Sequence, residues 1–186
     1  DYSGKRPHLV DRHTGEERPV ELFVAALGAS SYIFAEATEA QNLPSWVGSH
    51  IRMAESFGGS TAIWVPDNLK SGITTPCRYE PEVNRTYADL AAHYGAVVIP
   101  ARAGHPKDKP KVEAAVLLAQ RWILAVLRNR IFFSLADLNV AIRECVDAIN
   151  RRPMKKLGAS RQELFEQLDR PALVPLPVDR YEMREW

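Results

Sequence analysis

Apolar and polar residues alternate along the first part of the chain in the way that is typical of β-strands. Three segments follow this pattern with a period of two residues, at 7–11, 20–28 and 31–38. Thr14 and Gly15 lie between the first two segments and supply a turn, so we expect these two segments to form a hairpin. The third segment follows after a short break, which predicts three antiparallel strands in meander order.

Farther along the chain, apolar residues recur at helical spacing, and short apolar runs separate the predicted helices. Residues 43–59 predict an amphipathic helix that starts near Pro44 and stops at a pair of glycines. Residues 61–65 predict a buried strand, and a helix over 84–95 leads to a last strand over 96–100. We therefore expect an α/β fold with a five-stranded mixed sheet, in which three antiparallel strands precede two parallel ones and helices flank the sheet.

The remainder of the chain is predicted to be helical and then extended. A long helix is expected over 109–130, a second over 134–152, and a short third with a Ser-x-x-Glu capping pattern over 160–168. The end of the chain is rich in proline, which predicts an extended linker toward a further module. The expected domains are a core of residues 1–133, a helical extension of 134–169 and a linker of 170–186.

Charge is distributed unevenly, although the net charge is only +1. Residues 1–99 hold 8 Lys/Arg against 12 Asp/Glu, whereas residues 100–156 hold 12 against 5. A basic middle beside an acidic first half is expected of a protein that holds a polyanion on one surface. On charge alone, a solvated basic face is an equally good interpretation.

Composition limits the protein class and the compartment. Apolar residues make up 46% of the sequence, enough for a buried core, and no apolar run is long enough to span a membrane. Cys77 and Cys145 are far apart and have no neighbouring ligand residues, which argues against a zinc site or a disulfide framework. We expect a cytoplasmic protein, and the start at Asp1 without a leader suggests a segment of a longer chain.

Three acidic residues occupy matched positions in the predicted elements. Asp1 opens the first strand region, Asp67 follows the strand at 61–65, and Glu113 lies in the first turns of the long helix. We expect them to meet at one edge of the sheet, where a carboxylate cluster requires a cation. Mg²⁺ prefers oxygen ligands, and two such ions can catalyse displacement at phosphorus.

Each acid also has a simpler interpretation. Asp1 is an exposed terminus, Asp67 with Asn68 forms an Asx-turn, and Glu113 is favoured near a helix start by the helix dipole. What favours a functional Glu113 is that it borders a stripe expected to be buried. The residues of that stripe are Val112, Val116, Ala119, Ile123 and Val126, widened by Leu117, Leu124 and Leu127.

A basic, Pro/Gly-containing loop leads into the long helix beside Glu113. Cations next to a carboxylate cluster suit the phosphate backbone of a nucleic acid. A simple mobile loop is the competing interpretation. The candidate DNA-binding residues are Arg102, His105, Lys107, Lys109 and Lys111, together with Asn68 and Lys70 after Asp67.

Several longer motifs resemble one known family. The chain is similar to the catalytic region of IstA-type transposases of the insertion sequence twenty-one family, which have an RNase H-like fold and an Asp-Asp-Glu triad. The similarity covers nearly the whole chain. The motifs that carry it are "PDNLKSGIT", "YEPEVNRTYADLAAHYG", "VVIPARAGHPKDKPKVE", "QRWILAVLRNRIFFSLADLN" and "RRPMKKLGASRQELFEQLDRPAL".

This resemblance implies a site and a reaction. Asp1, Asp67 and Glu113 would hold two Mg²⁺ ions, for which Mn²⁺ substitutes, with Asp1 bridging both ions. The implied reaction is cleavage at transposon ends to expose a 3′-hydroxyl, followed by attack of that hydroxyl on target DNA. Implied partners are transposon-end DNA, target DNA, an IstB-type AAA+ ATPase and further copies of the chain in a synaptic complex, at the nucleoid of a bacterial cell.

Two other functions remain open at this point. A nuclease or Holliday-junction resolvase of the same fold shares the metal chemistry but does not join strands. A DNA-binding or assembly module without chemistry would need no complete triad. The resemblance also implies DNA-binding domains outside this chain, so the isolated fragment is expected to fold and to be inactive on its own.

Overall fold

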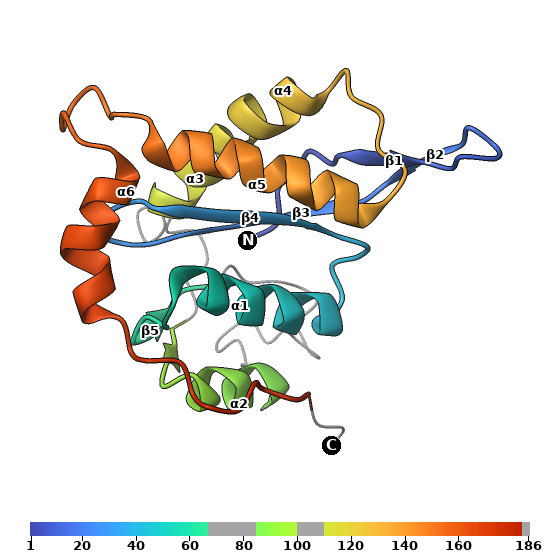
Figure 1. Ribbon diagram of the computed structural model, residues 1–186. Helices are drawn as coiled ribbons and strands as arrows, with labels where there is room; N and C mark the ends of the chain where they lie inside the picture. Colours follow the sequence, from blue (N-terminus) through green and yellow to red (C-terminus); the bar gives the residue numbers. More distant parts are fainter. Residues whose placement is uncertain (67–84, 100–109, 184–186) are drawn as a thin grey trace. The chain divides into compact units, whose positions relative to one another are not determined.

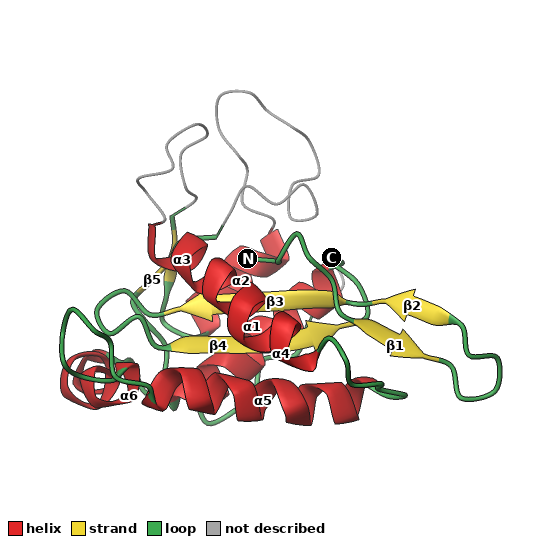
Figure 2. Cartoon of the chain, turned by 90° about the horizontal axis from the view of Figure 1, so that it is seen from above, coloured by secondary structure: helices red, strands yellow, loops and turns green. Residues whose placement is uncertain are grey.

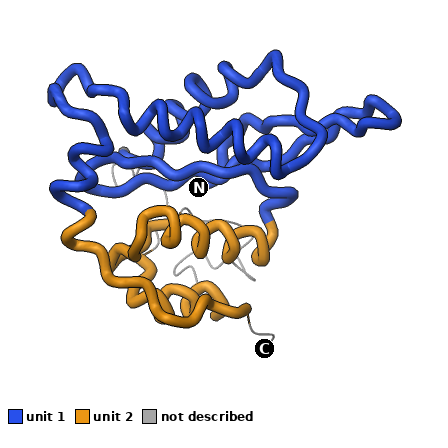
Figure 3. The backbone as a smooth tube through the Cα atoms, viewed as in Figure 1, with its two compact units in different colours: residues 1–41, 111–169 blue, residues 42–110, 170–186 orange. Residues whose placement is uncertain are grey.

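The computed structural model describes residues 1–66, 85–99 and 110–183, which fall into two compact units (Figure 3). Unit 1 is built from the first forty-one residues and from the helical segment that follows the second gap. Unit 2 is built from the middle of the chain and its end. Their ranges are 1–41 and 111–169 for unit 1, and 42–110 and 170–186 for unit 2.

The strands of unit 1 form two antiparallel pairs. β1 (His8–Val10) pairs with β2 (Glu17–Pro19), and β3 (Glu21–Ala26) pairs with β4 (Ile33–Thr38). A hairpin around Gly15 is present as expected, but its second strand, β2, lies wholly before the predicted segment 20–28, most of which forms β3. Val20 stands between β2 and β3, where its side chain is buried and its N–H continues the first pair by donating to the Pro7 carbonyl at 2.9 Å.

A helical run of residues 110–127 crosses unit 1 and contains a wide turn. It consists of α3 (Pro110–Ala119), a π-helical segment (Gln120–Leu124) and α4 (Ala125–Leu127). The single helix expected over 109–130 is therefore present as one run that ends earlier. A π turn adds a residue to a helical turn and shifts which side chains face the core.

Helix α5 (Leu135–Arg151) starts as the sequence predicts. The Ser134 hydroxyl accepts from the Asp137 N–H at 3.1 Å, which satisfies one of the free donors at the helix start. The predicted capping box of Ser160 and Glu163 is also present and opens α6 (Arg161–Leu164). A π-helical segment (Phe165–Asp169) and a short 3-10 turn (Arg170–Ala172) follow α6.

The core of unit 1 lies between the β3–β4 pair and the helices that cover it. Figure 2 shows α5 running along β4, and buried residues of α5 pack against buried residues of both strands. The helical extension expected from residue 134 therefore shares its core with the strands. Its members include Leu22, Val24, Ile33, Ala35, Ala119, Ile123, Leu138, Ile142 and Ile149.

Two asparagines of α5 bond the free edge of β4. The Asn150 side chain accepts from the Ile33 N–H at 3.0 Å and donates to the Ile33 carbonyl at 2.9 Å. Asn139 does the same at Ala37, at 2.7 and 3.0 Å. Each amide thereby satisfies one donor and one acceptor of an edge strand, as a neighbouring strand would.

Unit 2 begins with the predicted amphipathic helix, α1 (Leu43–Phe57). The Asn42 side chain accepts from Ser45 N–H at its start, and Gly58, with a φ of 74°, ends it in the left-handed conformation that favours glycine. The unit also contains α2 (Arg85–His93) and the parallel pair of β5 (Ile63–Trp64) and β6 (Val97–Val98), labelled in part in Figure 1.

The α/β fold class is confirmed, with a difference in detail. The described strands pair two by two, as β1–β2, β3–β4 and the parallel β5–β6, where the sequence predicts a single five-stranded sheet. The division of the chain at residues 133 and 169 stays a prediction. Within the described residues, no helix combines the length and the apolar character needed to cross a bilayer.

Candidate active site

Asp1 is held in register beside β3. Its backbone nitrogen donates to the Val24 carbonyl at 2.9 Å, and the Val24 N–H donates back to the Asp1 carbonyl at 2.7 Å. Two residues later, the Ser3 N–H donates to the Leu22 carbonyl at 2.8 Å. The chain before β1 therefore runs antiparallel to β3, as a further strand would.

This register decides which face of the sheet Asp1 occupies. Directly opposed residues of antiparallel strands share a face, so Asp1 shares a face with Val24, and Ser3 shares one with Leu22. Val24 and Leu22 belong to the core that the helices of unit 1 cover. Asp1, which is half-buried, therefore stands on the helix-covered face of this sheet.

Two hydrogen bonds fix how α3 runs over that face. The Gln120 amide donates to the Ser3 hydroxyl at 3.2 Å, and the Lys111 ammonium donates to the Ser31 hydroxyl at 3.0 Å. Ser3 pairs with Leu22 near the start of β3, and Ser31 lies in the turn between β3 and β4. Following the helix backward from Gln120 to Lys111 thus leads from near the start of β3 to its carboxyl end.

Asp1 and Glu113 lie toward the same end of unit 1. Ser3 pairs with Leu22, and Asp1 pairs with Val24. The chain from Ser3 back to Asp1 therefore runs along β3 toward the β3–β4 turn. Glu113 comes two residues after Lys111, in the first turn of α3. The two predicted acids therefore lie toward the same end of unit 1, Asp1 on the helix-covered face of the sheet and Glu113 on a helix that covers it; that they share a catalytic site stays a prediction.

The β3–β4 turn at this end is anchored by the last helical segment of unit 1. The Asp169 carboxylate accepts from the Ser30 N–H at 2.9 Å, and the rings of Tyr32 and Phe165 stack with centroids 4.5 Å apart. Ser31 has a φ of 60°, a left-handed conformation that non-glycine residues seldom adopt. The hydroxyl that accepts from Lys111 is thus presented by a turn that is braced from a distant part of the chain.

Glu113 differs from its predicted surroundings. Its side chain is exposed, and so are two of the eight residues of the predicted stripe, since Leu117 is 56% exposed and Val126 55%; the other six are buried or half-buried. The buried residues of the run instead repeat every four positions. They are Ala115, Ala119, Ile123 and Leu127. An α-helix has about 3.6 residues per turn, so a strict spacing of four needs the wider π turn to stay on one face.

The other predicted site residues lie outside the described residues, apart from Lys111, which is exposed. Among the residues that the structure does describe, no group of three or more Asp, Glu, His or Cys side chains comes together. The predictions that fall outside are the acid Asp67 and the DNA-binding candidates Asn68, Lys70, Arg102, His105, Lys107 and Lys109.

The strand that leads toward Asp67 is held by an aromatic cluster in unit 2. The Trp64 ring of β5 lies 5.2 Å from that of His50 and 6.0 Å from that of Tyr87, and Trp46 lies 4.4 Å from His50. His50 is bonded at both nitrogens, to the Trp46 carbonyl at 2.9 Å and the Tyr87 hydroxyl at 3.1 Å. Burial lowers the pKa of His50 to about 3, so this imidazole is neutral at pH 7 and is a packing residue.

Sequence reasoning missed the side chains that connect the elements of the site. Ser3, Ser31 and Gln120 are ordinary polar residues, and nothing local marks them. Gln120 does lie seven positions after Glu113, two helical turns along, so that both fall on one side of the run. That spacing is the one signal from which its role could have been suspected.

Comparison with known proteins shows that the chain is similar to proteins named as putative transposases. No family model matches it. It is 47% identical over 186 residues to "Putative transposase y4bL/y4kJ/y4tB" of Sinorhizobium fredii, covering 100% of the chain and 36% of that protein. It is 45% identical over 183 residues to "Putative transposase for insertion sequence IS408" of Burkholderia multivorans, and the match covers 98% of this chain and 35% of that protein. "Putative transposase Rv3428c" of Mycobacterium tuberculosis is 34% identical over 188 residues, and the match covers 100% of this chain and 45% of that protein. The chain thus spans less than half the length of these relatives.

Solved structures share its fold. A chain of the simian T-cell lymphotropic virus intasome, in complex with a PP2A regulatory subunit, matches with a TM-score of 0.63 and 12% identity, covering 100% of this chain and 59% of that one. The catalytic core domain of BIV integrase matches with a TM-score of 0.56 and 12% identity, covering 89% of this chain and 94% of that one. The HTLV-2 integrase catalytic core domain in complex with magnesium matches with a TM-score of 0.54 and 12% identity, covering 88% of this chain and 94% of that one. The chain therefore has the RNase H-like fold of integrase catalytic cores, and the resemblance to a transposase is confirmed.

Proposed function

We propose that this chain is the catalytic domain of a DNA transposase that cleaves transposon ends and joins the exposed 3′-hydroxyl to target DNA. The chain is homologous along its whole length to proteins named as transposases, and it has the fold of integrase catalytic cores. The observation that supports the proposal is that the Asp1 backbone pairs with Val24 of β3, while the helical run that carries Glu113 bonds Ser3 and Ser31, so that both acids lie toward the β3–β4 turn of unit 1.

The proposed catalytic acids are Asp1, Asp67 and Glu113. Carboxylate oxygens are the ligands that Mg²⁺ prefers, so the acids fit a magnesium site, and a structural neighbour is described as a complex with magnesium. Two bound Mg²⁺ ions, or Mn²⁺ in their place, would activate the attacking oxygen and stabilise the leaving one. The chain's own contribution is to hold Asp1 by the β3 register and Glu113 by the bonds of Gln120 and Lys111 on either side of it.

The DNA backbone is proposed to lie along the basic residues next to this site. Lys111 is exposed, two residues from Glu113, and its ammonium, which gives one donor to the Ser31 hydroxyl, keeps two donors for a phosphate. Lys and Arg contacts to phosphates position DNA without reading its sequence. The further members of this surface are Arg102, His105, Lys107, Lys109, Asn68 and Lys70.

The proposed partners follow from the same reaction. Joining two transposon ends to one target requires more than one copy of the chain, and one structural neighbour belongs to an intasome. We also propose an IstB-type AAA+ ATPase as helper, and action at the nucleoid in the cytoplasm. Both rest on the family resemblance of the motifs around Asp67 and in the helix of Glu113.

A strand-transfer assay with the full-length protein, labelled transposon ends and Mg²⁺ tests the proposal. Asp1→Asn, Asp67→Asn and Glu113→Gln should each abolish end cleavage and joining while leaving DNA binding in place. Glu144→Gln removes an exposed acid of α5 and serves as the matched control, with activity retained.

Three results would contradict parts of the proposal. Joining by any of the three triad variants would remove that acid from the site. Cleavage without joining by the wild-type protein would identify a nuclease of this fold. Tight binding of transposon ends with neither cleavage nor joining, in Mg²⁺ and in Mn²⁺, would identify a DNA-binding or assembly module.

A further inference from the structure

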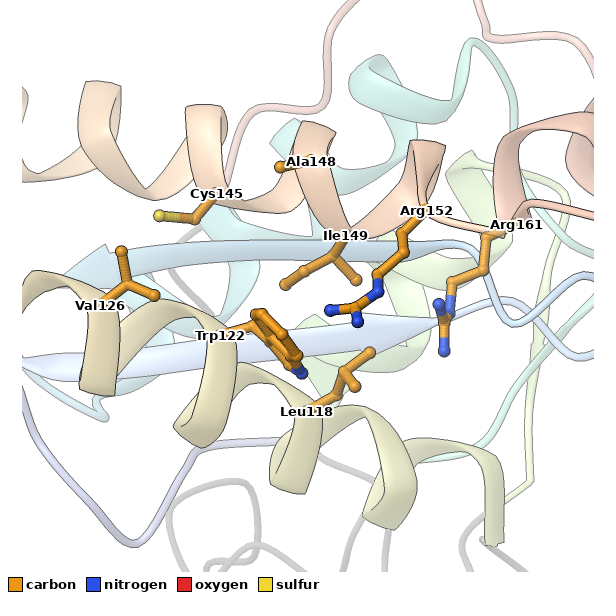
Figure 4. A pocket seen from close by; sticks show the side chains of 8 residues that line it. All are labelled: Leu118, Trp122, Val126, Cys145, Ala148, Ile149, Arg152 and Arg161. Atoms are coloured by element: carbon orange, nitrogen blue, oxygen red, sulfur yellow. The ribbon is translucent and has the colours of Figure 1, made fainter. Parts of the chain in front are cut away.

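A pocket opens between the helices of unit 1, apart from the proposed catalytic acids. It has a volume of about 290 Å³ and is lined from three elements (Figure 4). The helical run 110–127 supplies one wall, α5 supplies the other, and the start of α6 closes one end. The lining residues are Leu118, Trp122, Val126, Cys145, Ala148, Ile149, Arg152 and Arg161.

The walls of this pocket are apolar and yet reached by water. Trp122 is 43% exposed and Val126 is 55% exposed, although Ile149 beneath them belongs to the buried core. Leu117, 56% exposed, extends the apolar surface on the same helical run. Large apolar side chains that border a hollow, rather than standing singly, mark a surface that gains free energy when a ligand covers it.

Two arginines lie at the end of the pocket away from Val126 and Cys145 (Figure 4). The Arg152 guanidinium lies over the Trp122 ring, 4.2 Å from its centroid, which fixes its plane beside the apolar wall. Arg161 is partly buried, and its Nε is enclosed without any hydrogen-bond partner among the described residues. Burial also lowers the pKa of Arg161, because desolvation disfavours its charged form.

We propose that this pocket binds an acidic peptide segment of a partner protein, with an apolar side chain between Trp122 and Ile149 and a neighbouring carboxylate on Arg161 and Arg152. A carboxylate offers two acceptors that match the fork of a guanidinium, and the terminal nitrogens of Arg152 and Arg161 at the end of the pocket supply the donors. The apolar side chain would cover the exposed ring of Trp122. The proposal is independent of the catalytic role of the chain.

The lining favours a peptide over a nucleic acid. Apart from the two guanidinium groups, the Trp122 indole N–H and the Cys145 thiol, the lining side chains offer apolar carbons. A nucleobase placed there would leave its ring nitrogens and exocyclic groups without hydrogen bonds, at a cost that an aliphatic or aromatic side chain does not incur. A volume of about 290 Å³ also suits one large side chain and its neighbour more than a stretch of nucleotides.

Binding to the full-length protein can be measured with a panel of acetylated pentapeptides, in which Leu, Phe, Met or Trp is flanked by Asp or Glu. Isothermal titration gives the affinity, and the variants below report the site. We expect at least one peptide to bind with a dissociation constant of about 1 mM or lower. Arg161→Gln should weaken that peptide roughly tenfold, and so should replacing its acids by Asn or Gln.

Two further variants separate the pocket from the general charge of the protein. Ala148→Trp, at an exposed lining position, should fill the pocket and abolish binding while leaving the thermal midpoint close to that of the wild type. Arg143→Gln removes an exposed arginine of α5 that does not line the pocket, and the affinity should stay unchanged.

The proposal is overturned by any of three results. No peptide of the panel binds at about 1 mM. A peptide binds, but Arg161→Gln and Ala148→Trp bind it as the wild type does. A short oligothymidylate binds in place of the peptides and loses affinity in Arg161→Gln, in which case the pocket is a nucleic-acid site.

Discussion

Acidification should loosen unit 2 through His50. The buried imidazole is neutral in the folded state because its pKa is lowered to about 3, whereas in the unfolded chain it titrates near 6.5. Between these values the unfolded state binds a proton that the folded state does not. The contribution of His50 to stability is therefore complete above pH 6.5 and is lost as the pH falls toward 3.

The size of this loss follows from the two pKa values. Each pH unit in that window costs about 1.4 kcal/mol, so that moving from pH 7 to pH 5 costs about 2 kcal/mol, or roughly thirtyfold in the equilibrium between closed and open states. The value at pH 5 depends little on the folded pKa as long as that stays below about 4. Carboxylates also titrate on acidification, so only the difference between variants isolates His50.

Amide hydrogen exchange in α1 measures this difference within the full-length protein. After correction for intrinsic exchange, the opening free energy of α1 should fall between pH 7 and pH 5 by about 2 kcal/mol more in the wild type than in His50→Gln. Glutamine retains an acceptor for Tyr87 and a donor for the Trp46 carbonyl. His13→Gln, in an exposed turn, is the control and should behave as the wild type does. Equal pH dependence in the wild type and His50→Gln would refute a neutral, buried His50.

Three other predictions concern unit 1. Asn150→Ala should lower the unfolding free energy by roughly 2–4 kcal/mol, because it leaves the backbone N–H and C=O of the buried Ile33 without hydrogen-bond partners. Amide hydrogen exchange in β4 measures this loss. Asn129→Ala, at an exposed position, is the control and should change the unfolding free energy by less than about 0.5 kcal/mol. Gln120→Leu and Ser3→Ala should each reduce strand transfer roughly tenfold with DNA affinity unchanged. Because one hydrogen bond joins the two residues, the double variant should be no less active than either single variant, and additive losses would contradict this. Lys111→Gln should reduce the slope of log DNA affinity against log salt concentration by about 1, because one phosphate contact is lost. The exposed Lys155→Gln is the control, and an equal reduction in its slope would mean that overall charge, and not a contact of Lys111, causes the effect.

The sequence predicts helix boundaries well because the groups that set them are local. Ser134, Ser160 with Glu163, and Gly58 each act on backbone groups within a few residues, and all are found in the predicted roles. The fold class follows in turn from the order of strands and helices. These features depend on neighbours along the chain, which a sequence displays directly.

Features that depend on distant neighbours were predicted poorly. The wide turn of Gln120–Leu124 leaves no local signature, so the predicted stripe included Leu117 and Val126, which are exposed, and omitted Ala115, which is buried. His50 is buried because Trp64 and Tyr87 reach it from other elements. The bond between Ser3 and Gln120, which holds the helical run over the strand of Asp1, became identifiable only from the structure.

The amides of Asn139 and Asn150 have a consequence for how copies of this protein can associate. An uncovered edge strand is a template on which a second chain can continue the sheet, and proteins block such edges in various ways. Here the outward-facing backbone groups of Ile33 and Ala37 are already engaged by side chains from α5. Growth of a sheet across β4 would first have to displace both asparagines, so assemblies of this protein are expected to form through side-chain surfaces, and misassembly by strand addition at this edge is suppressed.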